Sequence, residues 1–157
     1  MRTLFFAAFA TAACCFFSCQ NQPAPAPKMT GLAGSLQDST IVRIWPREMD
    51  TLLMTNPNIP IIDVRTEVEF RTSHIFRSIN CDANAPDFAQ RIVKLDRTSP
   101  VIVYDDNSSR SLQAAEKMKQ LDFKRIYEVA GGLYSLAREG KTLVAGDSGI
   151  DSSTILK

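Results

Sequence analysis

A chain of 157 residues has room for one globular domain, and a hydrophobic fraction of 45% with a charged fraction of 22% is ordinary for such a domain. The formal net charge is only +1, so the composition offers no basic surface of the kind that nucleic-acid binding requires. The same values exclude a wholly disordered chain and a fibrous repeat.

Residues 1–19 are predicted to be a targeting segment. Arg2 supplies a positive charge, and residues 4–17 are an almost unbroken apolar run. A membrane-spanning helix needs ~20 apolar residues, so this run is too short to cross a bilayer and is typical of the core of a signal peptide.

The apolar run ends in the residues FFSC and resembles the signal of a bacterial lipoprotein. The resemblance implies that Ser18 precedes the cleavage site and that Cys19 carries acyl chains, which hold a protein stably at a membrane. Cys14 and Cys15 are alternative acylation sites, and an ordinary secretory signal cut nearby is a further alternative. We therefore expect a lipid-anchored protein of the bacterial cell envelope, either periplasmic or surface-exposed.

Residues 20–40 are predicted to form a tether. They contain Pro-Ala repeats and few large apolar side chains, a composition that favours an extended linker. The globular pattern then occupies residues 41–140, and residues 141–157 are predicted to be a C-terminal tail.

Short apolar runs alternate with helical patterns throughout residues 41–140. Runs rich in β-branched residues predict strands at residues 41–44, 59–64, 78–80, 101–104 and 125–129. Helical spacing and helix-start residues predict helices after Pro46, over 67–71, after Pro86, over 109–121 and over 134–138. This alternation predicts an α/β fold in which helices cover both faces of a parallel sheet.

The stretch PVIVYDDNSSRS, from Pro100 to Ser111, places a buried strand, a polar loop and the start of a helix in direct succession. Backbone N–H groups at the start of a helix have no intrahelical partners, and the helix dipole adds partial positive charge there. In a parallel sheet, ligands also bind at this end of the strands. We therefore expect an anion-binding loop, formed by Asp105, Asp106, Asn107, Ser108, Ser109 and Arg110.

Residues 61–136 resemble a single rhodanese domain. The matching motifs, in the order in which the family has them, are Asp63-Val64-Arg65, Glu69-Phe70, Ser73-His74-Ile75, Tyr104-Asp105, Arg110-Ser111 and Gly131-Gly132. None of them is specific alone, but together their order and spacing indicate the family. The resemblance implies a small rhodanese-like α/β domain. For active members it also implies sulfurtransferase activity, in which a cysteine thiolate takes sulfur from a donor such as thiosulfate.

The sequence departs from this family at the residue that carries the chemistry. Active rhodaneses have a cysteine after the tyrosine of the central strand, whereas this chain has Asp105, and Ser108 stands where the family loop has a glycine. A carboxylate cannot form a persulfide, so no catalytic residue is assigned. We expect Asp105 to substitute for a bound anion by accepting loop N–H groups and pairing with Arg110, and the protein to be a non-catalytic binding module.

The carboxylates of the loop leave two other chemistries open. Asp63, Asp105 and Asp106 could bind a hard cation such as Mg²⁺ or Ca²⁺. Asp105 could attack phosphate esters, although the Asp-Asp-Asn run lacks the Asp-x-Asp spacing of that class. The related dual-specificity phosphatases have a loop one residue longer and need the cysteine, so that activity is not expected.

The remaining candidate residues are expected to have structural roles. Asp63 and Arg65 are predicted to form a polar pair near the loop, and His74 to hold the segment after the second strand. Cys81 is the one cysteine of the predicted domain, and it is either a buried thiol or, in an active sulfurtransferase, a displaced sulfur carrier. One cysteine and one histidine cannot form a zinc site, so we expect no metal and no cofactor. The expected partners are an unknown protein or a small anion, and the membrane through the lipid anchor.

Overall fold

The computed structural model describes residues 40–147 of the chain. The predicted signal peptide with Cys14, Cys15 and Cys19 lies outside these described residues, as do the tether up to residue 39 and residues 148–157. Within residues 40–147, no helix is both long enough and apolar enough to cross a membrane.

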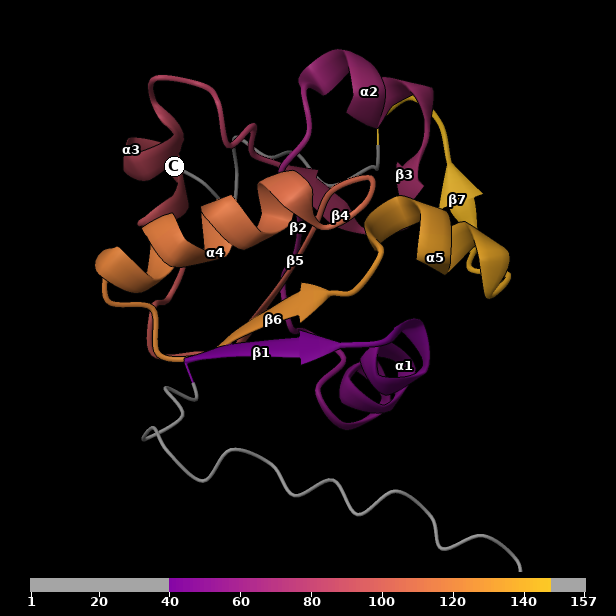
Figure 1. Cartoon of the computed structure of the whole chain (residues 1–157), viewed down its shortest axis with the longest axis horizontal. Coiled ribbons are helices and arrows are strands. Elements are labelled where there is room, and N and C mark those ends of the chain that lie inside the picture. Colours follow the sequence, from indigo (N-terminus) through magenta and orange to yellow (C-terminus); the bar gives the residue numbers. More distant parts are fainter. Residues whose placement is uncertain (1–39, 148–157) are drawn as a thin grey trace, which may run out of the picture. The chain divides into compact units, whose positions relative to one another are not determined.

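A five-stranded parallel sheet forms the centre of the domain (Figure 1). Its strands lie in the order β1-β6-β5-β2-β4, and every neighbouring pair is parallel. They are β1 (Ile41–Ile44), β2 (Ile61–Asp63), β4 (Ser78–Asn80), β5 (Val101–Tyr104) and β6 (Ile126–Val129). Because all five strands run the same way, the segments that follow them meet at the carboxyl edge of the sheet, where the candidate site lies.

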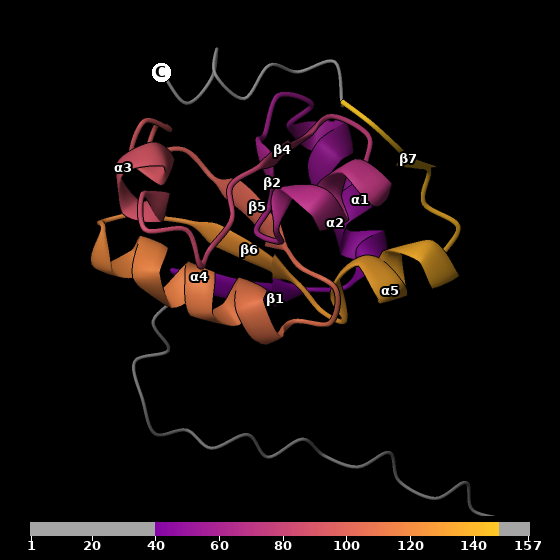
Figure 2. The ribbon, with the colours of Figure 1, turned by 90° about the horizontal axis from the view of Figure 1, so that it is seen from above.

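Helices cover both faces of this sheet, as the two views in Figures 1 and 2 show. The pair α3 and α4 packs on one face, and the pair α1 and α5 packs on the other. The helices are α1 (Pro46–Thr55), α2 (Glu67–Thr72), α3 (Phe88–Ile92), α4 (Ser109–Gln120) and α5 (Gly132–Arg138). The predicted fold class, an α/β domain with a parallel sheet and helices on both faces, is confirmed.

The central strand β5 is apolar throughout because both of its faces are buried. Val101 and Val103 belong to the hydrophobic core beneath α3 and α4, whereas Ile102 and Tyr104 belong to the core beneath α1 and α5. All four side chains are buried, because successive residues of a strand point to opposite faces. Burial of each such side chain contributes about 1.5–3 kcal/mol, so β5 holds both layers of the domain together.

Two elements begin two residues away from the predicted position, and the other differences from the predicted ranges are of one residue. The second strand begins at Ile61 rather than at residue 59, since Pro60 has no N–H group to donate to a neighbouring strand. The last helix begins at Gly132, two residues earlier than predicted, because the first N–H groups of this helix donate to the backbone of the loop after β5.

The chain beyond residue 140 continues to contact the domain. β7 (Leu143–Val144) pairs with β3 (His74–Ile75) in a small antiparallel sheet, and the Gly146 N–H donates to the Arg71 carbonyl at 2.8 Å. The first residues of the predicted tail therefore lie against the segment that follows β2.

Candidate functional site

The carboxylate of Asp105, directly after β5, points into the loop that follows it. Oδ1 accepts the backbone N–H of Asn107 at 3.1 Å and that of Ser108 at 2.5 Å, and Oδ2 accepts the N–H of Arg110 at 2.7 Å. Asp105 is only 1% exposed. The N–H groups that would bind an external anion therefore bind this carboxylate, which is the arrangement expected if Asp105 takes the place of that anion.

The opposite side of the same loop is held by the first turn of α5. The Leu133 N–H donates to the Asp105 carbonyl at 2.7 Å, and the Tyr134 N–H donates to the Asp106 carbonyl at 3.1 Å. Gly132 makes this approach possible, because a Cβ atom there would lie 2.3 Å from the Asp105 carbonyl oxygen, and its φ of +53° also favours glycine. The loop is thus fixed through its amides on one side and through its carbonyls on the other.

Ser108 occupies the one left-handed position of the loop. Its φ is +86°, a conformation that residues other than glycine rarely adopt, and the side chain is buried. The hydroxyl donates to the Val129 carbonyl at 3.2 Å and accepts the Gly131 N–H at 2.7 Å. The serine therefore offsets its backbone strain with two hydrogen bonds that fasten the loop to the turn between β6 and α5.

A buried arginine joins the turn after β2 to the loop. Arg65 donates to the Asp63 carboxylate at 2.6 Å, to the Ser73 carbonyl at 2.6 Å and to Asp106 at 3.1 Å. Burial opposes its charge, but hydrogen bonding to Asp63 and the nearby carboxylates outweigh that effect and raise the pKa of Arg65. The polar pair predicted for Asp63 and Arg65 is confirmed.

Arg110 is paired, but not with the residue that the sequence suggested. Its guanidinium binds Glu69 through two hydrogen bonds, at 2.9 and 2.7 Å, and Asp106 at 2.7 Å. Only its backbone N–H contacts Asp105, so the predicted Arg110–Asp105 side-chain pair is wrong. The reason is geometric: the carboxylate of Asp105 faces the inside of the loop, whereas the Arg110 side chain extends over its outside.

Glu69 is therefore a site residue whose role could not be assigned from the sequence. It also closes the N-terminus of α2, because its carboxylate accepts the N–H of Thr66 at 2.9 Å while its own N–H donates to the Thr66 hydroxyl at 3.3 Å. The hydrogen bonds from Arg110 hold the pKa of Glu69 well below its usual range, and the same bonds raise the pKa of Arg110. The one local signal was the Thr-x-x-Glu spacing, which predicts a helix start and not a pairing partner.

A second buried carboxylate is connected to Asp105 through one hydroxyl. Ser111 donates to Glu128 Oε1 at 2.7 Å and lies 3.2 Å from Asp105 Oδ1. Glu128 is fully buried on β6, and its Oε2 lies 3.2 Å from the Nε of Arg43 on β1. This connection joins the end of β5 to β6 and β1. The sequence predicted no role at the site for Glu128 or Arg43.

His74 and Cys81 lie outside this network of the loop. His74 is buried, stacks on the ring of Phe70 at 3.8 Å and places Nδ1 2.8 Å from the Phe70 carbonyl oxygen, so it holds α2 against β3. Cys81 is buried in the core beneath α3 and α4, and burial raises the pKa of its thiol to about 11. It is therefore a protonated thiol at neutral pH.

The acidic side chains do not converge as cation ligands would. The Asp105 carboxylate is turned toward loop amides, Asp63 binds Arg65, and Asp106 binds both Arg65 and Arg110. In the part of the chain that the structure describes, no three His, Cys, Asp or Glu side chains lie where they could hold a metal ion together. Two other predicted loop residues, Asn107 and Ser109, are exposed to solvent.

Comparison with known proteins relates this domain to one family. The family model described as Rhodanese-like domain matches residues 46–139, more than half of the chain. The tRNA uridine(34) hydroxylase of Pelagibacter ubique (strain HTCC1062) is 25% identical over 112 residues, which are 71% of this chain and 37% of that protein. The chain thus spans little more than a third of the length of this relative.

Solved structures show the same fold. The Alr3790 protein from Anabaena sp. superposes with a TM-score of 0.60 at 20% identity, over 65% of this chain and 82% of that one. A rhodanese-related protein from Thermoplasma volcanium has a TM-score of 0.57 at 25% identity, over 65% and 96% of the two chains. The thiosulfate sulfurtransferase from Pseudomonas aeruginosa has a TM-score of 0.56 at 22% identity, over 67% of this chain and 20% of that one.

The close approach of α5 to the loop gives a testable prediction. Gly132→Ala should destabilise the domain by more than ~2 kcal/mol, because the new methyl group meets the Asp105 carbonyl in addition to the left-handed backbone strain. Gly140→Ala is the matched control: its φ is +74°, but no atom lies within 4 Å of the added Cβ, so only the strain of ~1 kcal/mol applies. Urea unfolding of both variants measures the difference, and equal losses would show that the loop does not depend on this contact.

Proposed function

The chain belongs to the rhodanese-like domain family, and we propose that it is a member that binds a partner without transferring sulfur. In this proposal a lipid anchor holds the domain in the bacterial cell envelope, either periplasmic or surface-exposed, where it acts as a binding or regulatory module. Of the two expected partner classes, a small anion and a protein, the loop favours a protein, because Asp105 already accepts the amides that would bind an anion.

The carboxylate of Asp105 inside the loop is the observation that carries the proposal. In the active members that the chain resembles, a cysteine thiolate at this position attacks the outer sulfur of thiosulfate, the S–S bond breaks, and sulfite leaves with the electron pair. We take Asp105 to replace that cysteine. A carboxylate oxygen is not a soft sulfur nucleophile, so it cannot accept the sulfur atom that the thiolate accepts.

Sulfur transfer through Cys81 is the competing function, and its surroundings do not favour it. A reactive cysteine needs an exposed, electropositive environment that stabilises the thiolate. Cys81 is fully buried among apolar side chains, and burial raises its thiol pKa to about 11. The likeness to a thiosulfate sulfurtransferase, at 22% identity, concerns the fold.

A sulfurtransferase assay tests the proposal. We expect the purified chain to form no thiocyanate from thiosulfate and cyanide above the buffer rate. In Asp105→Cys, the amides of Asn107, Ser108 and Arg110 should stabilise a thiolate, so thiosulfate should add the mass of one sulfur atom to the protein. Glu116→Cys is the control, because it places an exposed thiol on α4 outside the loop, and it should gain no sulfur.

Two results would contradict this account. Thiocyanate formation by the unaltered chain that disappears in Cys81→Ala would show that the domain is an active sulfurtransferase. A folded Asp105→Cys variant that gains no sulfur would show that the loop amides are not an anion site at all.

The membrane tether is supported by the sequence of residues 1–40, in which an apolar run ending in FFSC precedes a segment rich in Pro and Ala. Intact mass of the natural protein, extracted from membranes, should show acyl chains on Cys19. Cys19→Ser should release the domain from the membrane fraction, while Cys15→Ser should not. Unmodified protein in the soluble fraction would argue for a cleaved secretory signal instead.

A further inference from the structure

Basic side chains gather at the amino edge of the sheet, opposite the Asp105 loop. They come from two segments that lead into neighbouring strands: residues 93–100, between α3 and β5, and residues 119–125, at the end of α4 and before β6. Figure 1 shows α3, the end of α4 and the start of β6 on one side of the sheet, and the loop after β5 on the other. The five basic residues of these segments form what we call the basic edge: Lys94, Arg97, Lys119, Lys124 and Arg125.

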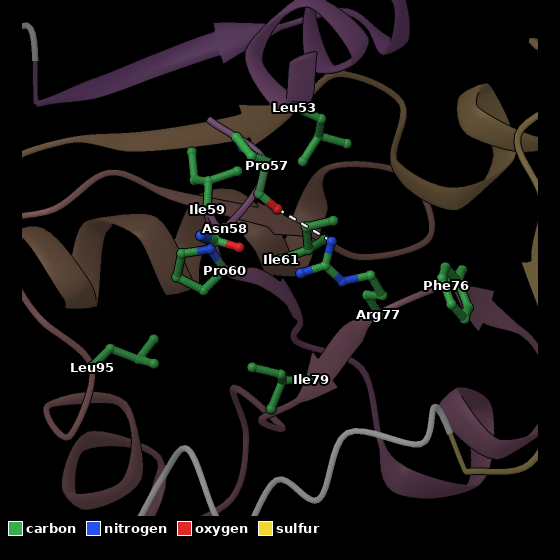
Figure 3. A pocket seen from close by; sticks show the side chains of 10 residues that line it. All are labelled: Leu53, Pro57, Asn58, Ile59, Pro60, Ile61, Phe76, Arg77, Ile79 and Leu95. Atoms are coloured by element: carbon green, nitrogen blue, oxygen red, sulfur yellow. Dashed lines mark hydrogen bonds between the residues drawn. The ribbon is translucent and has the colours of Figure 1, made fainter. Parts of the chain in front are cut away.

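Hydrogen bonds hold the two segments side by side. The Lys124 N–H donates to the Arg97 carbonyl at 2.9 Å, and the Arg97 guanidinium donates to the Leu121 carbonyl at 3.1 Å. Leu95 is buried and lines an apolar groove (Figure 3), so its side chain fixes the first segment to the domain. The basic edge is therefore a fixed surface, on which Lys94, Arg97 and Lys124 are exposed to solvent.

The two acidic residues of these segments, Asp96 and Asp122, do not cancel this charge. The Asp96 carboxylate accepts the Thr98 N–H at 2.9 Å, the Thr98 hydroxyl at 2.7 Å and the Ser99 hydroxyl at 2.5 Å, so it faces its own turn. Five basic and two acidic side chains leave an excess of three positive charges here, although the whole chain carries only +1. The charge of the domain is therefore segregated rather than in excess.

The carboxyl edge of the sheet carries the reverse charge. Residues 63–72 and 105–110 hold five carboxylates and three guanidinium groups: Asp63, Glu67, Glu69, Asp105 and Asp106, with Arg65, Arg71 and Arg110. An anionic surface therefore attracts the basic edge and repels the edge that contains the Asp105 loop. This asymmetry would orient the domain at such a surface.

The chain enters the domain at the basic edge. The Thr40 carbonyl accepts the Ile126 N–H at 2.7 Å, and Ile126 directly follows Arg125. Residues 20–39 separate Thr40 from Cys19 and can span at most ~70 Å. The lipid anchor proposed above, on which this step rests, would keep the basic edge close to the membrane. At such a high local concentration a weak contact is sufficient.

We propose that the basic edge docks on anionic lipid headgroups and thereby turns the Asp105 loop away from the membrane. Each Lys or Arg side chain near an anionic membrane strengthens binding about fivefold, provided that it lies within a Debye length, ~10 Å at 0.1 M salt. The fixed surface brings several such side chains to the headgroups together. Val93, 37% exposed beside Lys94, adds an apolar contact. The loop then faces the partners of the domain.

Tryptophan fluorescence shows which edge meets the membrane. Trp45, the one tryptophan of the chain, follows β1 at the carboxyl edge and is 65% exposed. Trp45→Phe with Val93→Trp moves the fluorophore to the basic edge. The acylated full chain is reconstituted in phosphatidylcholine vesicles that contain a brominated lipid quencher, with or without anionic phosphatidylglycerol. The introduced tryptophan should be quenched only with phosphatidylglycerol, whereas Trp45 of the unaltered chain should be quenched in neither vesicle.

Charge reversal tests the electrostatic basis, with the ratio of docked to undocked domain as the readout. Lys94→Glu with Lys124→Glu, made in the relocated-tryptophan variant, should lower this ratio at least ~20-fold, because two basic side chains worth about fivefold each are lost. Arg47→Glu with Arg138→Glu is the matched control: it changes the net charge equally, at exposed positions outside the basic edge, and should leave docking unchanged. An increase of salt to ~1 M, where the Debye length is ~3 Å, should release the domain.

Flotation separates this proposal from the proposed anchor. Vesicles of phosphatidylcholine alone bind the chain only through acyl chains, so they report the anchor. A chain without an anchor should still prefer anionic over neutral vesicles, at higher lipid concentration, if the basic edge docks as proposed. Three results would overturn the proposal: quenching of Trp45 instead of the introduced tryptophan, quenching that does not depend on phosphatidylglycerol, and equal effects of the two charge-reversed pairs.

Discussion

The loop at the carboxyl edge of the sheet depends on one carboxylate that binds it from within. Asp105 accepts three backbone N–H groups, two of them at 2.7 Å or less, although it is buried. Hydrogen bonds to an ionised acceptor are about twice as strong as neutral ones, and a buried amide without a partner costs ~1–3 kcal/mol. The conformation of the loop is therefore supplied by the chain itself and does not require a bound anion.

The surroundings of Asp105 reinforce this arrangement. α5 binds the loop carbonyls, Ser108 fastens the loop to the turn after β6, and the guanidinium groups of Arg65 and Arg110 meet at Asp106 above it. A surface that is ordered in advance loses little conformational entropy when a partner binds, which suits a recognition module. The loop itself contains no cysteine, and the domain's one described cysteine is buried elsewhere.

Local sequence patterns were sufficient to predict the fold and the position of the loop. They were insufficient to predict which distant residues contact the loop. The apolar run of β5 and the polar residues after it are adjacent in the chain, so they predict a strand, a loop and a helix start together. Arg110 pairs with Glu69, which lies 41 positions earlier in the chain. Gly132, at the start of α5 after β6, lies against Asp105, which follows β5. Such contacts arise only when the strands are assembled in their order, and neither spacing nor composition encodes them.

The central claim is that the Asp105 carboxylate occupies the anion-binding amides of the loop. Titration of ¹⁵N-labelled protein with thiosulfate tests it directly, with the amide resonances of Asn107, Ser108 and Arg110 as the readout. The account predicts that these resonances stay in place in the unaltered chain and move in a saturable way in Asp105→Ala. A saturable shift of all three in the unaltered chain would show that the loop binds an external anion despite Asp105, and would contradict the account.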